Sequence, residues 1–267
     1  MKASTPGHGS GIVLAIATLI AILATLTVNI LSNFSPPRGA NIGEIANTTL
    51  QRVEITPANY AFAIWGLIYL GLIAYGLYQL HPTQRGHPTI RRVDALLIVA
   101  CVAQMVWVYL FTLSLFWPSV IAMLGILLPL IAAYLQLQVG RERVARERKW
   151  LTHVPFSVYL GWISVATIVN IASALYISGW NGWGISGAGW TVIMLIVGAA
   201  IAAIIAVQRA DIAFTLVFIW AYVAIAVRQL DDPAIWITAL VAAIVLAGLL
   251  LFGRIRRRKI SISTSTE

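Results

Sequence analysis

Residues 154–177 read VPFSVYLGWISVATIVNIASALYI and contain no charged side chain. A helix needs about 20 apolar residues to cross the hydrocarbon core of a bilayer, which is roughly 30 Å thick, and this stretch is long enough. Seven more apolar runs surround it, at residues 11–31, 60–80, 94–113, 118–138, 190–208, 212–228 and 233–253, of which 212–228 is the shortest. Because irregular backbone is not stable against lipid, we expect an all-α, polytopic bundle of about eight transmembrane helices.

The composition supports a membrane protein. The chain of 267 residues is 60% hydrophobic and 10% charged, whereas soluble domains carry about 25% charged residues. Its net charge of +9 would suggest a nucleic-acid partner in a soluble protein. Here the basic residues lie in short segments between apolar runs, so the expected partner is the lipid bilayer and not nucleic acid. The single cysteine, Cys101, excludes an internal disulfide.

The basic residues also predict the orientation of the helices. If the N-terminus is cytoplasmic, all but three of the 18 Lys and Arg residues fall on the inner side, the exceptions being Arg38, Arg52 and Arg228. Cytoplasmic segments of membrane proteins carry this excess of positive charge. We therefore expect both termini to be cytoplasmic, in a plasma or inner membrane or in an internal membrane. Residues 254–267 would form a basic and then polar cytoplasmic tail.

The sequence holds no pattern typical of a catalytic or metal site. A Gly-rich phosphate loop and a His-Glu-x-x-His pair are both missing, and the histidines do not recur at metal-ligand spacing. Asp94 and Asp211 stand at the ends of apolar runs, so we expect no carboxylate within a membrane helix. Since such carboxylates often form proton relays, this argues against ion-coupled transport. We assign no catalytic residue, no metal ligand and no required cofactor, and an enzyme is the weakest interpretation.

Three of the expected helices carry aromatic and amide side chains at helical spacing. In the run 60–80, Trp65 and Tyr69 are four residues apart and share a face, and similar stripes occur in the runs 94–113 and 154–177. Aromatic walls with a few polar anchors are typical of small-molecule pockets, although ordinary helix packing would use the same residues. The candidate ligand-binding residues are Trp65, Tyr69, Gln104, Trp107, Tyr159, Trp162 and Asn170.

The segment YLGWISVATIVN, residues 159–170, resembles the TspO/MBR family of tryptophan-rich sensory proteins, which are related to the mitochondrial translocator protein. The shared positions are Tyr159, Leu160, Trp162, Ser164 and Asn170. Pro57, Trp65 and Tyr69 fit a second segment of the family, and Ala103 and Gln104 fit a third. This chain departs from the family at Asn59 and Ala61, where the family has Trp and Phe, and at Val108 and Phe111, where it usually has Asn and Trp.

The resemblance covers roughly residues 11–177. It implies a five-helix bundle over residues 1–177. The three additional helices over 178–253 and the tail lie beyond it and are expected from the apolar runs and the charge pattern alone. The resemblance further implies a cavity that the long segment between the first two helices closes, with Pro36, Pro37 and Gly39 shaping the segment.

The implied ligand is an apolar or aromatic small molecule, a porphyrin or another haem-like tetrapyrrole, and many members of the family are homodimers. Trp and Tyr rings suit the faces of a porphyrin. Arg38 or Arg52 could pair with a propionate, although a solvated loop charge is the simpler interpretation of each.

Sensing and transport both stay open for such a protein, and two other functions are compatible with the sequence. One is a transporter of small apolar or amphipathic solutes, which eight helices allow. The other is a structural or assembly subunit of a membrane complex. Gly198, Ala202 and Ala206 form a small-residue face that permits close contact with another helix, either within the chain or in a partner.

Overall fold

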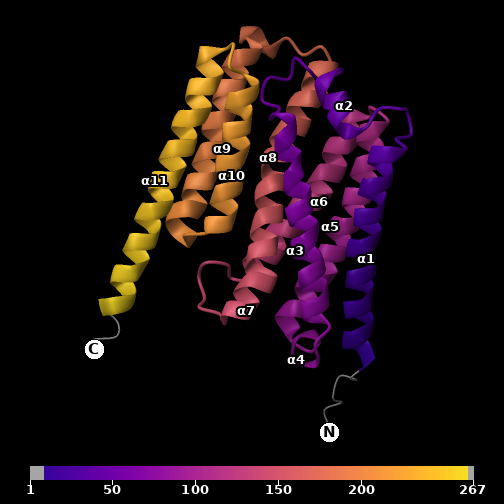
Figure 1. Cartoon of the computed structure of the whole chain (residues 1–267), viewed down its shortest axis with the longest axis vertical. Coiled ribbons are helices and arrows are strands. Elements are labelled where there is room, and N and C mark those ends of the chain that lie inside the picture. The colour runs from indigo at the N-terminus through magenta and orange to yellow at the C-terminus, as the bar shows by residue number, and fades with distance from the viewer. Residues whose placement is uncertain (1–8, 264–267) are drawn as a thin grey trace.

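The computed structural model describes residues 9–263, and within them every regular element is helical. Two groups of long helices lie side by side (Figure 1). We call α1, α3, α5, α6 and α8 the five-helix unit, and α9, α10 and α11 the three-helix unit. The elements are α1 Gly9–Phe34, α2 Ile42–Asn47, η1 Asn59–Ala63, α3 Ile64–Gln79, α4 Pro82–Arg85, α5 Pro88–Thr112, α6 Phe116–Gln136, α7 Arg146–Arg148, η2 Lys149–His153, α8 Val154–Ile177, η3 Gly182–Gly184, α9 Gly187–Arg209, α10 Ile212–Arg228 and α11 Pro233–Ser263.

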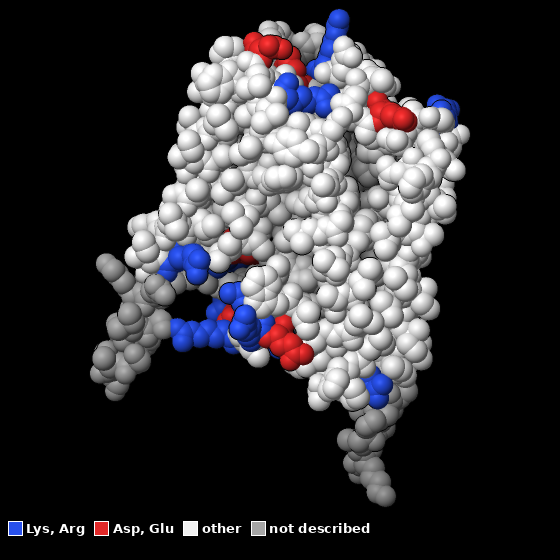
Figure 2. All heavy atoms as spheres, in the orientation of Figure 1, with Lys and Arg blue, Asp and Glu red and all other residues white. Residues whose placement is uncertain are grey.

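Seven helical segments of the described chain are long and apolar enough to cross a membrane, and α10, with 17 residues, is a shorter apolar helix. Large aliphatic side chains point outward from these segments, and Ile121 and Ile244 are more than 70% exposed. On the face shown in Figure 2, charged residues gather at the two ends and leave a broad uncharged band between them. These features confirm the predicted all-α, multi-pass bundle, whose surface is adapted to lipid.

Both ends of the described chain lie at the same end of the bundle (Figure 1), as an even number of crossings requires. Which side of the membrane this end faces stays a prediction. The last helix, α11, continues to Ser263, beyond the end at residue 253 that hydropathy predicted. The basic part of the expected tail is therefore helical, and residues 264–267 lie outside the described residues.

Asp94 corrects one expectation from the sequence. Helix α5 begins at Pro88, with His87 as its N-cap, so more than one helical turn precedes Asp94. The Asp94 side chain is buried, and its carboxylate accepts a hydrogen bond of 2.6 Å from the Tyr75 hydroxyl. The expectation that no carboxylate lies within a membrane helix is therefore wrong. The hydropathy pattern did not predict the first turns of α5 because they carry the charged residues Arg91 and Arg92. Pro88 was a signal for the true start, since proline favours the first position of a helix.

The two units meet along α8, which contacts α3 and α6 on one side and α10 on the other. Gly161 lies where α8 crosses α10. A Cβ atom at this position would lie 3.1 Å from the Val217 side chain and 3.3 Å from the Phe214 carbonyl oxygen. The glycine thus permits a close approach of the two helices, and α8 becomes part of the core of both units.

The small-residue face of α9 serves packing within the chain. Gly198, Ala202 and Ala206 are all buried. A Cβ atom on Gly198 would lie 2.6 Å from the Tyr222 hydroxyl of α10, and one on Gly253 of α11 would lie 2.5 Å from the Ala206 carbonyl oxygen. The face therefore brings α10 and α11 close to α9, and it gives no support to a role in binding a partner protein.

Candidate ligand-binding site

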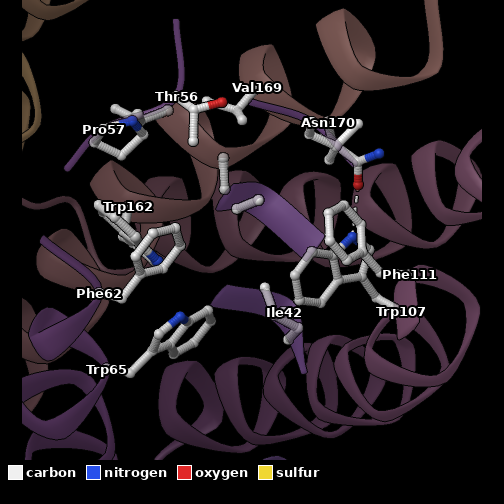
Figure 3. A pocket seen from close by; sticks show the side chains of 14 residues that line it. Ile42, Thr56, Pro57, Phe62, Trp65, Trp107, Phe111, Trp162, Val169 and Asn170 are labelled. Carbon is white, nitrogen blue, oxygen red and sulfur yellow. Dashed lines mark hydrogen bonds between the residues drawn. The ribbon is translucent and has the colours of Figure 1, made fainter. Parts of the chain in front are cut away.

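A cavity lies under the segment that joins α1 to η1, which we call the lid (residues 35–58). Figure 3 shows the side chains that surround it. The lid contributes Ile42, Ala46, Leu50, Thr56 and Pro57. The helices contribute Phe62 of η1, Trp65 of α3, Trp107 and Phe111 of α5, and Trp162, Val165, Ala166, Val169 and Asn170 of α8. The cavity is thus built from the five-helix unit and its own lid.

The cavity is narrow, and its lining is almost wholly apolar. The space between the side chains is about 590 Å³ including the open mouth, but the centre of a water molecule fits in only about 60 Å³ of it. No lining residue is charged, and Thr56 and Asn170 supply the only polar groups besides the indole N–H donors. An apolar lining with a few polar groups is the usual composition of small-molecule pockets.

Aromatic rings form two opposite walls (Figure 3). On one wall the Phe62 ring meets the Trp162 ring edge to face, with centroids 5.9 Å apart, and Trp65 lies beside them. On the other wall the Trp107 and Phe111 rings lie 5.1 Å apart with an interplanar angle of 32°. Rings held in this way present faces and edges to the cavity, which suits a ligand that is itself flat and aromatic.

Asn170 fixes the orientation of the Trp107 wall. The Trp107 indole N–H donates a hydrogen bond of 2.6 Å to the Asn170 Oδ1 atom, and the Asn170 amide donates one of 2.9 Å to the Ser119 hydroxyl. The three residues belong to α5, α8 and α6, so one amide joins three helices. Buried indole and amide groups need such partners because an unpaired polar group in the apolar interior is costly.

The structure brings four of the seven candidate residues to the cavity. Trp65, Trp107, Trp162 and Asn170 line it. Tyr69 and Tyr159 lie behind Trp65, with ring centroids 5.6 Å and 6.2 Å from it, and they do not line the cavity. Gln104 is fully buried in α5 and does not line it either. Tyr69 and Tyr159 thus pack against Trp65 from behind.

Several polar groups around the cavity form no hydrogen bond with the described residues. They are the Thr56 hydroxyl, the Tyr69 hydroxyl and both ends of the Gln104 amide. Buried polar groups are nearly always paired with protein, water or ligand, so these groups are a reserve of hydrogen-bonding capacity. Thr56 faces the cavity itself, and Gln104 and Tyr69 are buried in the helices that carry Trp107 and Trp65.

The sequence predicted that the lid segment closes the cavity, but not which of its residues line the cavity. Helix α2 begins with a capping box, in which the Glu44 N–H donates to the Asn41 side chain at 3.0 Å and the Asn41 N–H donates to the Glu44 carboxylate at 2.7 Å. The Asn-x-x-Glu spacing was a signal for this short helix. Phe111 shares a helical stripe with Trp107, so it too could have been found. Arg38 and Arg52, the candidate partners of a propionate, are exposed on the lid and do not line the cavity.

The Glu54 carboxylate of the lid lies beside Gly187, at the beginning of α9. Burial raises the pKa of Glu54 above its usual value, the nearby Asp232 raises it further, and a hydrogen bond with Thr191 opposes both effects. Among the described residues, no three His, Cys, Asp or Glu side chains lie together as a metal site would require.

Comparison with known proteins agrees with this geometry. A family model described as TSPO-like protein matches residues 15–252. The match extends through α9, α10 and most of α11, so these helices belong to the matched region, whereas the resemblance seen in the sequence ended near residue 177. A search of curated proteins and a search of solved structures gave no match. The chain therefore belongs to the TSPO-like family and is a multi-pass integral membrane protein.

Proposed function

We propose that this TSPO-like protein binds a flat, apolar ligand of the tetrapyrrole class in the cavity under the lid, for sensing or for transport. The observation that carries the proposal is the convergence of Trp65, Trp107 and Trp162 from three helices on one cavity without charged lining. Aromatic side chains contribute large apolar areas and stack favourably on aromatic ligands. The Thr56 hydroxyl in the cavity wall offers a polar anchor of the kind that small-molecule sites use.

A porphyrin would fit this site in one orientation only. Its apolar face suits the Trp walls, whereas its propionates have no charged partner among the lining residues. Burying an unpaired carboxylate is very costly, so the propionates would stay at the mouth, near the lid surface. Because the cavity is narrow as it stands, binding requires the lid to move outward.

A titration of the purified protein with protoporphyrin, followed by quenching of Trp fluorescence, tests this proposal. We expect saturable quenching, with the dissociation constant raised about tenfold or more in Trp162→Leu, because the variant loses one ring of an aromatic wall. The matched control is Trp183→Leu, since Trp183 is 78% exposed and does not line the cavity. Equal affinity in the wild type and Trp162→Leu would contradict the site, and equal quenching in empty detergent would contradict binding altogether.

Asp94 supports transport as a second candidate function. It is a buried carboxylate within a membrane helix, paired with Tyr75, and such groups commonly mark proton or substrate pathways. If the protein couples transport to protons, porphyrin uptake into proteoliposomes should rise with an imposed pH gradient, and Asp94→Asn should remove that dependence. Uptake that equals empty liposomes would contradict transport and would leave binding for sensing as the function.

A further inference from the structure

The lid is held from outside the five-helix unit, by the last turn of α10. Five lid residues line the cavity, so the position of the lid sets the closure of the cavity. The Arg228 guanidinium donates hydrogen bonds of 3.0 Å to the Ala46 carbonyl oxygen and 3.0 Å to the Asn47 side chain, and a longer one of 3.4 Å to the Pro57 carbonyl oxygen. Ala46 and Pro57 are themselves lining residues, so one side chain contacts the lining segment at two separate points.

The contact to Ala46 caps a helix. Helix α2 is only six residues long, and Ala46 lies in its last turn. The final carbonyl groups of a helix have no partner within it and carry the negative end of the helix dipole. A guanidinium, which is always charged and presents several N–H donors in a fixed plane, suits this position. Arg228 therefore stabilises α2 itself as well as its attachment.

Other groups of α10 strengthen the same attachment. The Gln229 side chain donates to the Glu54 carbonyl oxygen at 2.7 Å, and the Ala58 N–H donates to the Ala224 carbonyl oxygen at 3.0 Å. The Trp220 indole N–H donates to the Ala61 carbonyl oxygen at 3.2 Å. These bonds reach both the lid and η1, yet none of the three α10 residues lines the cavity.

We propose that Arg228 is a latch, a positioning residue through which the three-helix unit holds the lid closed and controls the rate at which ligand enters and leaves. The proposal rests on the proposed ligand-binding function of the cavity. Arg228 does not line the cavity, so its loss should change both rates in the same direction and the affinity much less. A residue that touched the ligand would instead change mainly the rate of dissociation.

Hydrogen exchange of the lid tests the latch without any ligand. We expect Arg228→Ala to speed the exchange of amides in residues 42–58 by about tenfold or more, because charged hydrogen bonds to the lid are lost. Arg228→Lys, which keeps the charge but not the planar set of donors, should give an intermediate rate and serves if the alanine variant does not fold. The control is Arg52→Ala, which removes an exposed charge from the lid itself. Unchanged exchange in residues 42–58, or exchange that rises equally in all helices, would overturn the proposal.

Ligand kinetics separate the latch from the proposed function. Stopped-flow quenching with protoporphyrin should show association and dissociation both about tenfold faster in Arg228→Ala, with a dissociation constant close to that of the wild type. A changed dissociation constant with an unchanged association rate would overturn the latch. If the wild type shows no saturable binding, the proposed function fails, and the hydrogen-exchange result alone decides whether Arg228 holds the lid.

Discussion

Replacing Asn170 with Leu is expected to lower the free energy of unfolding by about 2–3 kcal/mol. The Asn170 amide accepts the indole N–H of Trp107 at 2.6 Å and donates to the Ser119 hydroxyl at 2.9 Å, and all three residues are buried. Leu fills a similar volume but leaves the indole N–H without this acceptor. Hydrogen bonds between membrane helices contribute about 0.6 kcal/mol on average, so most of the effect comes from the unpaired donor.

The measurement is reversible unfolding in mixed detergent, followed by circular dichroism. A double-mutant cycle with Trp107→Phe isolates the hydrogen bond, because the Phe variant has no indole N–H to leave unpaired. Asn170→Leu should lower the free energy of unfolding less in the Trp107→Phe background than in the wild type. An equal loss in both backgrounds would show that the Trp107–Asn170 hydrogen bond is not the cause.

Gln104→Leu is the matched control for Asn170→Leu, and we expect it to raise the free energy of unfolding instead of lowering it. It also replaces a buried amide of the five-helix unit, but neither end of the Gln104 amide has a partner among the described residues. We expect stability to rise by about 1 kcal/mol, because no hydrogen bond within the protein is lost and an unpaired polar group is removed. A loss as large as that of Asn170→Leu would mean that a bound water or ligand pairs with Gln104.

The helices and the aromatic walls could be predicted from the sequence for a simple reason. A helix that crosses lipid needs a long apolar run, so the helices can be located by hydropathy. The spacing of residues along a helix decides which of them share a face, so Trp65, Trp107 and Trp162 could each be placed on a stripe of aromatic and amide side chains. Tyr69 and Tyr159 obey the same spacing but lie one layer behind the cavity, and spacing alone does not distinguish these depths.

Spacing did not predict which residues of the lid line the cavity or how the lid is attached to α10. Residues 35–58 mix polar and apolar positions, and the pairing of Arg228 with Ala46 joins residues far apart in the chain. In the sequence, Arg228 is distinguished only as one of the three basic residues expected on the non-cytoplasmic side of the membrane. Its role depends on how the last turn of α10 approaches the lid, which no local pattern encodes.

Asp211→Ala is expected to lower the free energy of unfolding by about 3–4 kcal/mol, the largest effect we predict. The Asp211 carboxylate caps α10 by accepting the Phe214 N–H at 3.2 Å. It also accepts the Tyr134 hydroxyl of α6 at 2.8 Å and the Ser157 hydroxyl of α8 at 2.7 Å. The substitution therefore removes a helix cap and, at the same time, the bonds that join the beginning of α10 to the five-helix unit.

Two further variants divide this effect between the cap and the junction. Asp232→Ala removes a carboxylate that accepts the N–H groups of Ala234 and Ile235 at the start of α11, so it should cost only about 1 kcal/mol. Asp211→Asn keeps a good capping residue but has one acceptor oxygen in place of two, so its loss should be intermediate. If Asp211→Ala loses no more stability than Asp232→Ala, and Asp211→Asn loses almost none, the Asp211 carboxylate acts only as a cap.

A larger loss for Asp211→Ala would instead show that the bonds of Asp211 fasten the beginning of α10 to the five-helix unit. Asp211 binds α6 and α8 at its beginning, and Arg228 binds the lid at its end. Hydrogen exchange of the Asp211 variants then separates two possibilities. If residues 42–58 exchange faster when only the Asp211 end is loosened, α10 transmits the change along its length, and the lid is held by the whole helix. If the lid is unaffected, Arg228 holds it locally.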